Sequence, residues 1–167
     1  MPGIRPVTFA CRANFRQPPE EIAAQILDLA KWPEFTGYAF LPGIRQAEFE
    51  VRTPEVVGTR IRVTNTDGSS HVEEIVEWVP DRRVQLRFGD FSPPLSRLAT
   101  GFDETWLFRR EGETTEVVRE FALWPKSWFG RLVLWGIARV LERAVGRHLR
   151  QLVGGVSGAD ARGSESS

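Results

Sequence analysis

The sequence predicts an α+β fold in which an antiparallel sheet packs against one long C-terminal helix. Two observations lead to this prediction. Residues 58–88 and 102–123 alternate between apolar and polar side chains, the period of half-buried strands. An apolar stripe at helical spacing then runs from about Trp128 to Val153. Apolar surfaces of this size have to cover one another, so we expect the helix to lie across the inner face of the sheet.

The first hairpin is expected at Asp67-Gly68, a dipeptide typical of a two-residue type I′ turn. In that register Ile61 pairs with Glu74, and both face inward. A three-residue turn at 80–82 then brings the next strand back on the same face. The inward residues of these strands are expected to be Ile61, Glu74, Val76, Trp78 and Phe88.

The last hairpin is expected to turn at Gly112-Glu113. A two-residue loop there places Trp106 opposite Arg119 and Glu104 opposite Phe121, all on the inner face together with other aromatic residues. Glu104 then lies diagonally from Arg119, within reach of an ion pair. The outer faces of the strands carry charges of alternating sign, and we expect that side to meet water.

The other elements follow from local signals. A strand is expected at Val7–Phe15, and a helix begins at Pro18-Pro19, because proline suits a first helical turn. Trp32-Pro33 ends that helix. A further strand is expected near residues 46–51.

The long segment 89–101 is too apolar for a simple hairpin and is expected to cover an opening. Ser127 is expected to cap the last helix. The stripe expected to face the sheet includes Phe129, Leu132, Val133, Gly136, Ile137, Val140, Leu141, Ala144, Val145, His148 and Leu152. Trp124 and Trp135 fall on the outer faces, where they either contact a partner or second copy or pack beneath the 91–98 loop.

Composition narrows the function. The chain has 167 residues, and its 22 basic and 22 acidic residues cancel, which argues against general attraction to nucleic acid or anionic lipid. The apolar helix is interrupted by arginines, and no secretory signal is evident, so we expect a cytoplasmic protein without integral membrane association. Residues 1–155 are expected to form one domain, and residues 156–167 a disordered tail.

These pieces together resemble the START-like (SRPBCC) superfamily, specifically its polyketide cyclase/dehydrase and lipid-transport branch. The resemblance covers about Val7 to Leu152. It is carried by the Pro18-Pro19-Glu20-Glu21 helix start, Trp32-Pro33-Glu34-Phe35, Val57-Gly58-Thr59-Arg60, the Asp67-Gly68 turn followed by Val72-Glu73-Glu74, Trp78-Val79-Pro80-Asp81-Arg82-Arg83, and the helix end Arg147-His148-Leu149-Arg150-Gln151-Leu152. It implies a helix-grip fold, in which a curved seven-stranded antiparallel sheet wraps around the C-terminal helix and two short helices follow strand one.

Three charged residues, Glu74, Glu104 and Arg119, are placed on the inner face, where an unpaired charge is costly. We favour a structural ion pair between Glu104 and Arg119. The alternative is catalytic: Arg119 binds a ligand oxygen while Glu104 or Glu74 moves a proton. His71 is expected on the outer face and His148 half-buried on the helix, so neither metal nor cofactor is expected.

The predicted function is binding or transport of a hydrophobic or amphipathic small molecule, such as a lipid, isoprenoid or aromatic polyketide-like compound, between sheet and helix. Two alternatives stay open: a cyclase, aromatase or dehydratase enzyme, and a co-chaperone-like interaction module with a filled core. A homodimer also stays open. The residues expected to line the cavity are Ile61, Val76, Trp78, Phe88, Phe102, Trp106 and Phe121 from the sheet, and Val133, Ile137 and Val140 from the helix.

Overall fold

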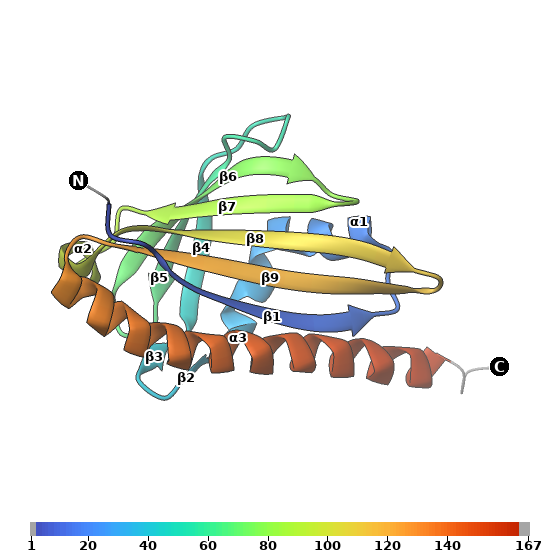
Figure 1. Ribbon diagram of the computed structural model, residues 1–167. Helices are drawn as coiled ribbons and strands as arrows, with labels where there is room; N and C mark the ends of the chain where they lie inside the picture. Colours follow the sequence, from blue (N-terminus) through green and yellow to red (C-terminus); the bar gives the residue numbers. More distant parts are fainter. Residues whose placement is uncertain (1–2, 164–167) are drawn as a thin grey trace.

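A computed structural model shows one strongly curved antiparallel sheet with a long helix along its concave side (Figure 1). The structure describes the backbone of residues 3–163 and the side chains of residues 3–154. The seven strands of the sheet lie in the order β1-β9-β8-β7-β6-β5-β4. They are β1 (Val7–Phe15), β4 (Ile44–Val51), β5 (Arg60–Asn65), β6 (Ser70–Val79), β7 (Arg83–Gly89), β8 (Ala99–Glu111) and β9 (Thr114–Pro125). The predicted fold class is confirmed.

The connection between β1 and β4 contains more short elements than the sequence predicted. Its first part is the short helix α1 (Pro19–Ala24), which begins with proline in its first turn and is followed by two 3₁₀ turns. A small hairpin, which the sequence did not predict, then precedes β4. The turns are η1 (Gln25–Leu27) and η2 (Leu29–Glu34), and the hairpin strands are β2 (Gly37–Tyr38) and β3 (Leu41–Pro42).

Two further helices complete the fold. The short helix α2 (Leu95–Leu98) precedes β8, and the long helix α3 (Trp128–Gly163) follows β9. Ser127 caps α3 as predicted, because its Oγ accepts a hydrogen bond of 2.9 Å from the Gly130 amide. The helix extends through residues 156–163 of the segment for which a tail was predicted. The remaining tail residues, 164–167, lie outside the described residues.

The face that α3 turns toward the sheet differs from the predicted one in the first turns of the helix, whereas the predicted residues Ile137, Leu141, Ala144, Val145, His148 and Leu152 are buried or line the interior cavity. Leu134 and Ala138 are buried, whereas Phe129 and Leu132 are among the most exposed apolar side chains. The first turns of α3 carry apolar residues all round, so the apolar spacing alone did not fix which side is buried. Because of this rotation Val133 and Val140 do not face the interior cavity.

Strand register also differs at one hairpin and agrees at another. The β8–β9 register is confirmed, with Trp106 opposite Arg119 and a two-residue loop between Glu111 and Thr114. The predicted β5–β6 register is wrong by one residue. Ile61 pairs with Glu73 instead of Glu74.

The cause is a longer turn. The Asn65 amide donates to the Ser69 carbonyl, so three residues, 66–68, form the loop. Gly68 alone supplies a positive φ, of 85°, as in a type I turn followed by a left-handed residue.

A bulge completes the change of register. The β6–β7 pairing is as predicted at Trp78 and Val84, but it shifts between Ile75 and Glu77. Val76 therefore sits at the irregularity and does not face the cavity. Turn and bulge together place odd-numbered residues of β6 inward between positions 71 and 75.

Candidate ligand cavity

The interior holds a cavity of about 410 Å³ between the sheet, α3 and the segments that cover the open end. Its wall is formed mainly by aromatic and aliphatic side chains. From β7, β8 and β9 they include Leu86, Phe88, Phe102, Trp106 and Phe121, from α3 Ile137, Leu141, Val145 and Leu152, and from the covering segments Ile22, Ile26, Trp32, Phe35, Phe91, Leu95 and Leu98. A pocket of this size and lining suits a mainly apolar small molecule.

One buried ion pair lies in this apolar wall. Arg119 Nε donates a 2.6 Å hydrogen bond to Glu104 Oε1, and the Arg119 Nη2 group contacts the same oxygen. The guanidinium also stacks over the ring of Trp106, 4.2 Å from its centre, and lies 5.5 Å from that of Phe121. The predicted pair of Glu104 and Arg119 is thus present, and both residues line the cavity.

The carboxyl group of Glu104 has an unusual proton affinity. Burial raises the pKa of Glu104, Arg119 opposes that rise, and the nearby Glu73 carboxylate adds to it. A buried acid with a raised pKa beside a fixed cation is an arrangement that can exchange a proton with a bound oxygen atom.

A second polar pair reaches the cavity from β6. His71 Nε2 and Glu73 Oε1 are 3.0 Å apart, and both side chains are largely buried. The imidazole stacks on Phe88 and lies close to Phe91 of the cover. The prediction that His71 faces water is wrong, because the one-residue change of register turns it and Glu73 inward.

His148 lies on the α3 side of the cavity, half-buried as predicted. Its Nδ1 atom is buried and has no hydrogen-bond partner among the described residues. Burial and, to a lesser extent, the positive charge of Arg119 lower the pKa of His148 to about 4. The imidazole is therefore neutral near pH 7.

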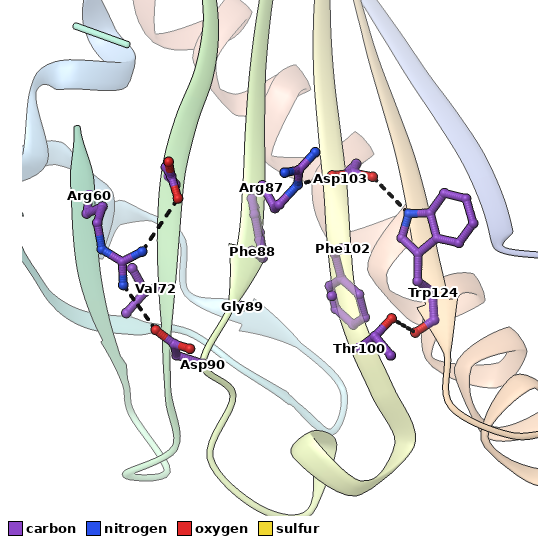
Figure 2. Close-up of a pocket in the computed structure, with 12 residues that line it drawn as sticks. Arg60, Val72, Arg87, Phe88, Gly89, Asp90, Thr100, Phe102, Asp103 and Trp124 are labelled. Carbon is purple, nitrogen blue, oxygen red and sulfur yellow. Dashed lines mark hydrogen bonds and ion pairs between the residues drawn. The ribbon is translucent and has the colours of Figure 1, made fainter. Parts of the chain in front are cut away.

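Glu74 belongs to a different site. It lines a hollow of about 420 Å³ on the outer face of the sheet, which Figure 2 shows. There Arg60 pairs with Glu74 at 3.5 Å and Arg87 with Asp103 at 3.3 Å. Asp103 also accepts a 2.8 Å hydrogen bond from Trp124 Nε1. These charges satisfy one another, so we place the ligand site in the interior cavity.

The structure brings together some predicted lining residues and separates others. Those that line the cavity are Phe88, Phe102, Glu104, Trp106, Arg119, Phe121 and Ile137. Those that do not are Ile61, Glu74, Val76, Trp78, Val133 and Val140. Ile61 is completely buried by packing and leaves no surface on a cavity, and Trp78 packs against the core beyond it. The role of each residue in binding stays a prediction.

The described residues hold no group of three His, Cys, Asp or Glu side chains arranged as metal ligands. Over the same range, none of the helices combines the length and apolar character that crossing a bilayer requires.

Comparison with known proteins identifies the family. The family model described as polyketide cyclase / dehydrase and lipid transport matches residues 9–155. The chain belongs to this family. This confirms the resemblance to the START-like superfamily drawn from the sequence. No curated protein matches the chain.

Solved structures share the fold at low sequence identity. Zhui aromatase/cyclase from Streptomyces sp. R1128 is 12% identical, with 91% of this chain and 94% of that chain covered and a TM-score of 0.68. A protein from Thermus thermophilus, TTHA0849, is 20% identical, with 92% and 99% covered and a TM-score of 0.67. A START superfamily protein from Mycobacterium smegmatis is 10% identical, with 87% and 98% covered and a TM-score of 0.60. At these identities the likeness shows the fold alone.

Proposed function

We propose that this protein binds a mainly apolar small molecule, lipid-like or aromatic, with at least one oxygen atom that meets Arg119. The observation behind this proposal is the interior cavity of about 410 Å³, whose apolar wall contains the Glu104–Arg119 pair. Two Arg119 nitrogens contact Glu104, and a guanidinium has five N–H donors, so donors remain for a ligand oxygen. The family description, which includes lipid transport, agrees with this proposal.

A variant that fills part of the cavity tests whether the ligand binds there. The probe is anilinonaphthalene sulfonate, whose fluorescence rises on entering an apolar site. Ile137→Phe adds a ring to the cavity wall and is expected to weaken binding of the probe by roughly tenfold or more. Val140→Phe, one turn away on α3 and outside the cavity, is the matched control and should bind like the parent. Equal affinity in both variants would place the site elsewhere.

A pair of probes tests whether Arg119 binds an oxygen atom of the ligand. Anilinonaphthalene sulfonate carries an anionic oxygen group, whereas N-phenylnaphthylamine has the same rings without it. Replacing both members of the ion pair (Arg119→Leu together with Glu104→Leu) avoids leaving one buried charge alone. We expect the sulfonate to lose affinity more than the neutral probe. An equal change for both probes would reject Arg119 as the anchor.

A second candidate is acid–base catalysis of the cyclase or dehydratase type, favoured by the raised pKa of Glu104. In a dehydration, Glu73 would take the proton next to a carbonyl held by Arg119. Glu104 would give its proton to the departing hydroxyl, which leaves as water. An aromatic β-hydroxy ketone is a suitable probe, because the product absorbs as a conjugated enone. Turnover that Glu104→Gln abolishes supports catalysis, and no turnover limits the protein to binding.

The third alternative, an interaction module with a solid core, receives no support from the interior. A space of about 410 Å³ among aromatic side chains is a feature that such a module does not need. Native mass spectrometry of freshly purified protein separates the two ideas. A co-purifying mass of lipid size supports binding, whereas the bare chain mass in every preparation would favour the interaction module.

A further inference from the structure

The first three turns of α3 present an apolar ridge to the outside. The exposed fractions are 73% for Trp128, 70% for Phe129, 69% for Leu132 and 50% for Trp135. Positions 128, 132 and 135 repeat at helical spacing on one side, opposite the buried Leu134. Four large side chains left open on one helix face form a surface that normally has a partner.

The surroundings of this ridge are basic, although the whole chain is neutral. Between residues 124 and 139 the sequence has three basic residues, Lys126, Arg131 and Arg139, and no Asp or Glu. The Lys126 side chain donates to the Ser96 carbonyl and that of Arg131 to the Arg5 carbonyl, and neither side chain forms an ion pair among the described residues. Arg139 pairs with Glu142 at 3.3 Å and lies over the ring of Trp135.

We infer that this ridge is a docking surface for an anionic lipid membrane, on which α3 lies with Trp128, Phe129, Leu132 and Trp135 inserted among the headgroups. Tryptophan rings are enriched at the membrane–water interface, and basic residues beside an apolar helix face attract anionic lipid. The side chains project from the surface as a ridge, which suits insertion into a deformable layer. This surface is distinct from the interior cavity, and the inference does not depend on the proposed function.

A second copy of the chain fits the ridge less well. A two-fold dimer through this face would set the basic surroundings of the ridge on one copy, which include Lys126 and Arg131, against the same basic surroundings on the other. Like charges around a small apolar contact oppose association. A membrane rich in phosphatidylglycerol offers the opposite charge to both residues.

The start of α3, which carries the ridge, lies beside α2 (Figure 1). Lys126 also donates from its backbone amide to the Leu98 carbonyl of α2, and Leu98 lines the cavity. A membrane that receives the ridge therefore lies beside the segment that closes the cavity.

Co-sedimentation of the full chain with vesicles tests the inference. The vesicles are phosphatidylcholine alone or phosphatidylcholine mixed with phosphatidylglycerol. We expect the parent to pellet with the mixed vesicles, and Trp128→Ser/Phe129→Ser to pellet roughly tenfold less, because the inserted rings are lost. Lys126→Gln/Arg131→Gln should lose most of the preference for the mixed vesicles, and raised salt should act in the same direction.

Matched controls remove an exposed apolar side chain or a charge elsewhere. Val57→Ser and Arg109→Gln, both on exposed positions away from α3, should pellet like the parent. Circular dichroism checks that every variant is folded. A parent that stays in the supernatant, or a Trp128→Ser/Phe129→Ser variant that pellets equally, would overturn the inference. So would a lipid-free dimer that this double variant converts to a monomer, because the face would then be a protein contact.

Discussion

Arg119 is held on several sides within the wall of the cavity. Glu104 supplies the opposite charge, and the Trp106 and Phe121 rings lie near the guanidinium face. This packing fixes the guanidinium plane before a ligand arrives, so binding loses little side-chain freedom. The same packing means that Arg119 contributes to folding as well as to the proposed site.

Removing one member of this pair is expected to be far more harmful than removing both. Arg119→Leu leaves the buried Glu104 carboxyl without its partner and should lower the free energy of unfolding by about 3 kcal/mol. Adding Glu104→Leu should recover most of that loss. Urea denaturation near pH 7 measures both variants.

The control for that experiment is an exposed ion pair on the outer face. Arg87→Leu breaks the contact with Asp103, and since the Arg87 side chain is 63% exposed, the loss should stay below about 1 kcal/mol. An Arg119→Leu variant that loses no more than Arg87→Leu would show that the buried pair is not needed for stability.

The short helix α2 packs closely against the first turn of α3 at a glycine of α3. A Cβ atom on Gly130 would lie 2.6 Å from the Leu98 carbonyl oxygen, too close for any side chain. Gly136 lies on the same helix, and a Cβ atom there would have no neighbour within 4 Å. Replacing Gly130 therefore tests close packing against α2, whereas replacing Gly136 tests helix propensity alone.

We expect opposite effects when each glycine is replaced by alanine. Gly130→Ala has to push α2 away and should lower the free energy of unfolding by about 1 kcal/mol or more. Gly136→Ala should raise it by up to about 1 kcal/mol, because alanine is the better helix former. Thermal unfolding gives both values. Two stabilised variants would mean that α2 yields freely to α3.

The pairing of the strands could be predicted from the sequence only where the turn length was clear and no bulge intervened. The β8–β9 hairpin was predictable because its loop has two residues and no irregularity lies between Glu104 and Val117, so strand alternation gave the ion pair. The β5–β6 hairpin was not, because Asp67-Gly68 fits loops of two or three residues. The bulge at Val76 has no signal in the alternation, and together with the longer turn it places Glu73 rather than Glu74 toward the cavity.

The buried face of α3 was mispredicted in its first turns for a reason that involves neither turns nor bulges. Its first turns are apolar on two faces, one buried against the sheet and one exposed as the ridge, and periodicity cannot rank two faces of similar character. Ile137 lies within the overlap of the predicted and observed faces, which explains why it alone of the three predicted α3 residues lines the cavity.

In the whole molecule, α3 packs mainly against β1 and β9 at one edge of the sheet, and the curved remainder stands away from it. The space left between them contains two titratable groups whose proton affinities are shifted in opposite senses. Glu104 binds its proton more tightly in the folded protein, so its stabilising contribution is lost as pH rises through its folded pKa. His148 binds its proton less tightly when folded. Its contribution is present above the ordinary pKa of 6.5 and is lost as pH falls toward about 4.

A variant without the imidazole isolates the second contribution. His148→Phe keeps an aromatic ring beside Phe35 and has no proton to gain. Between pH 7 and pH 4.5, the parent should lose about 1 to 2 kcal/mol more unfolding free energy than this variant, allowing for the partial exposure of the imidazole. Urea denaturation across this pH range measures the difference, and Val140→Phe, which changes no titratable group, should follow the parent throughout. Parallel curves for His148→Phe and the parent would mean that His148 takes up its proton equally well in the folded and unfolded chain.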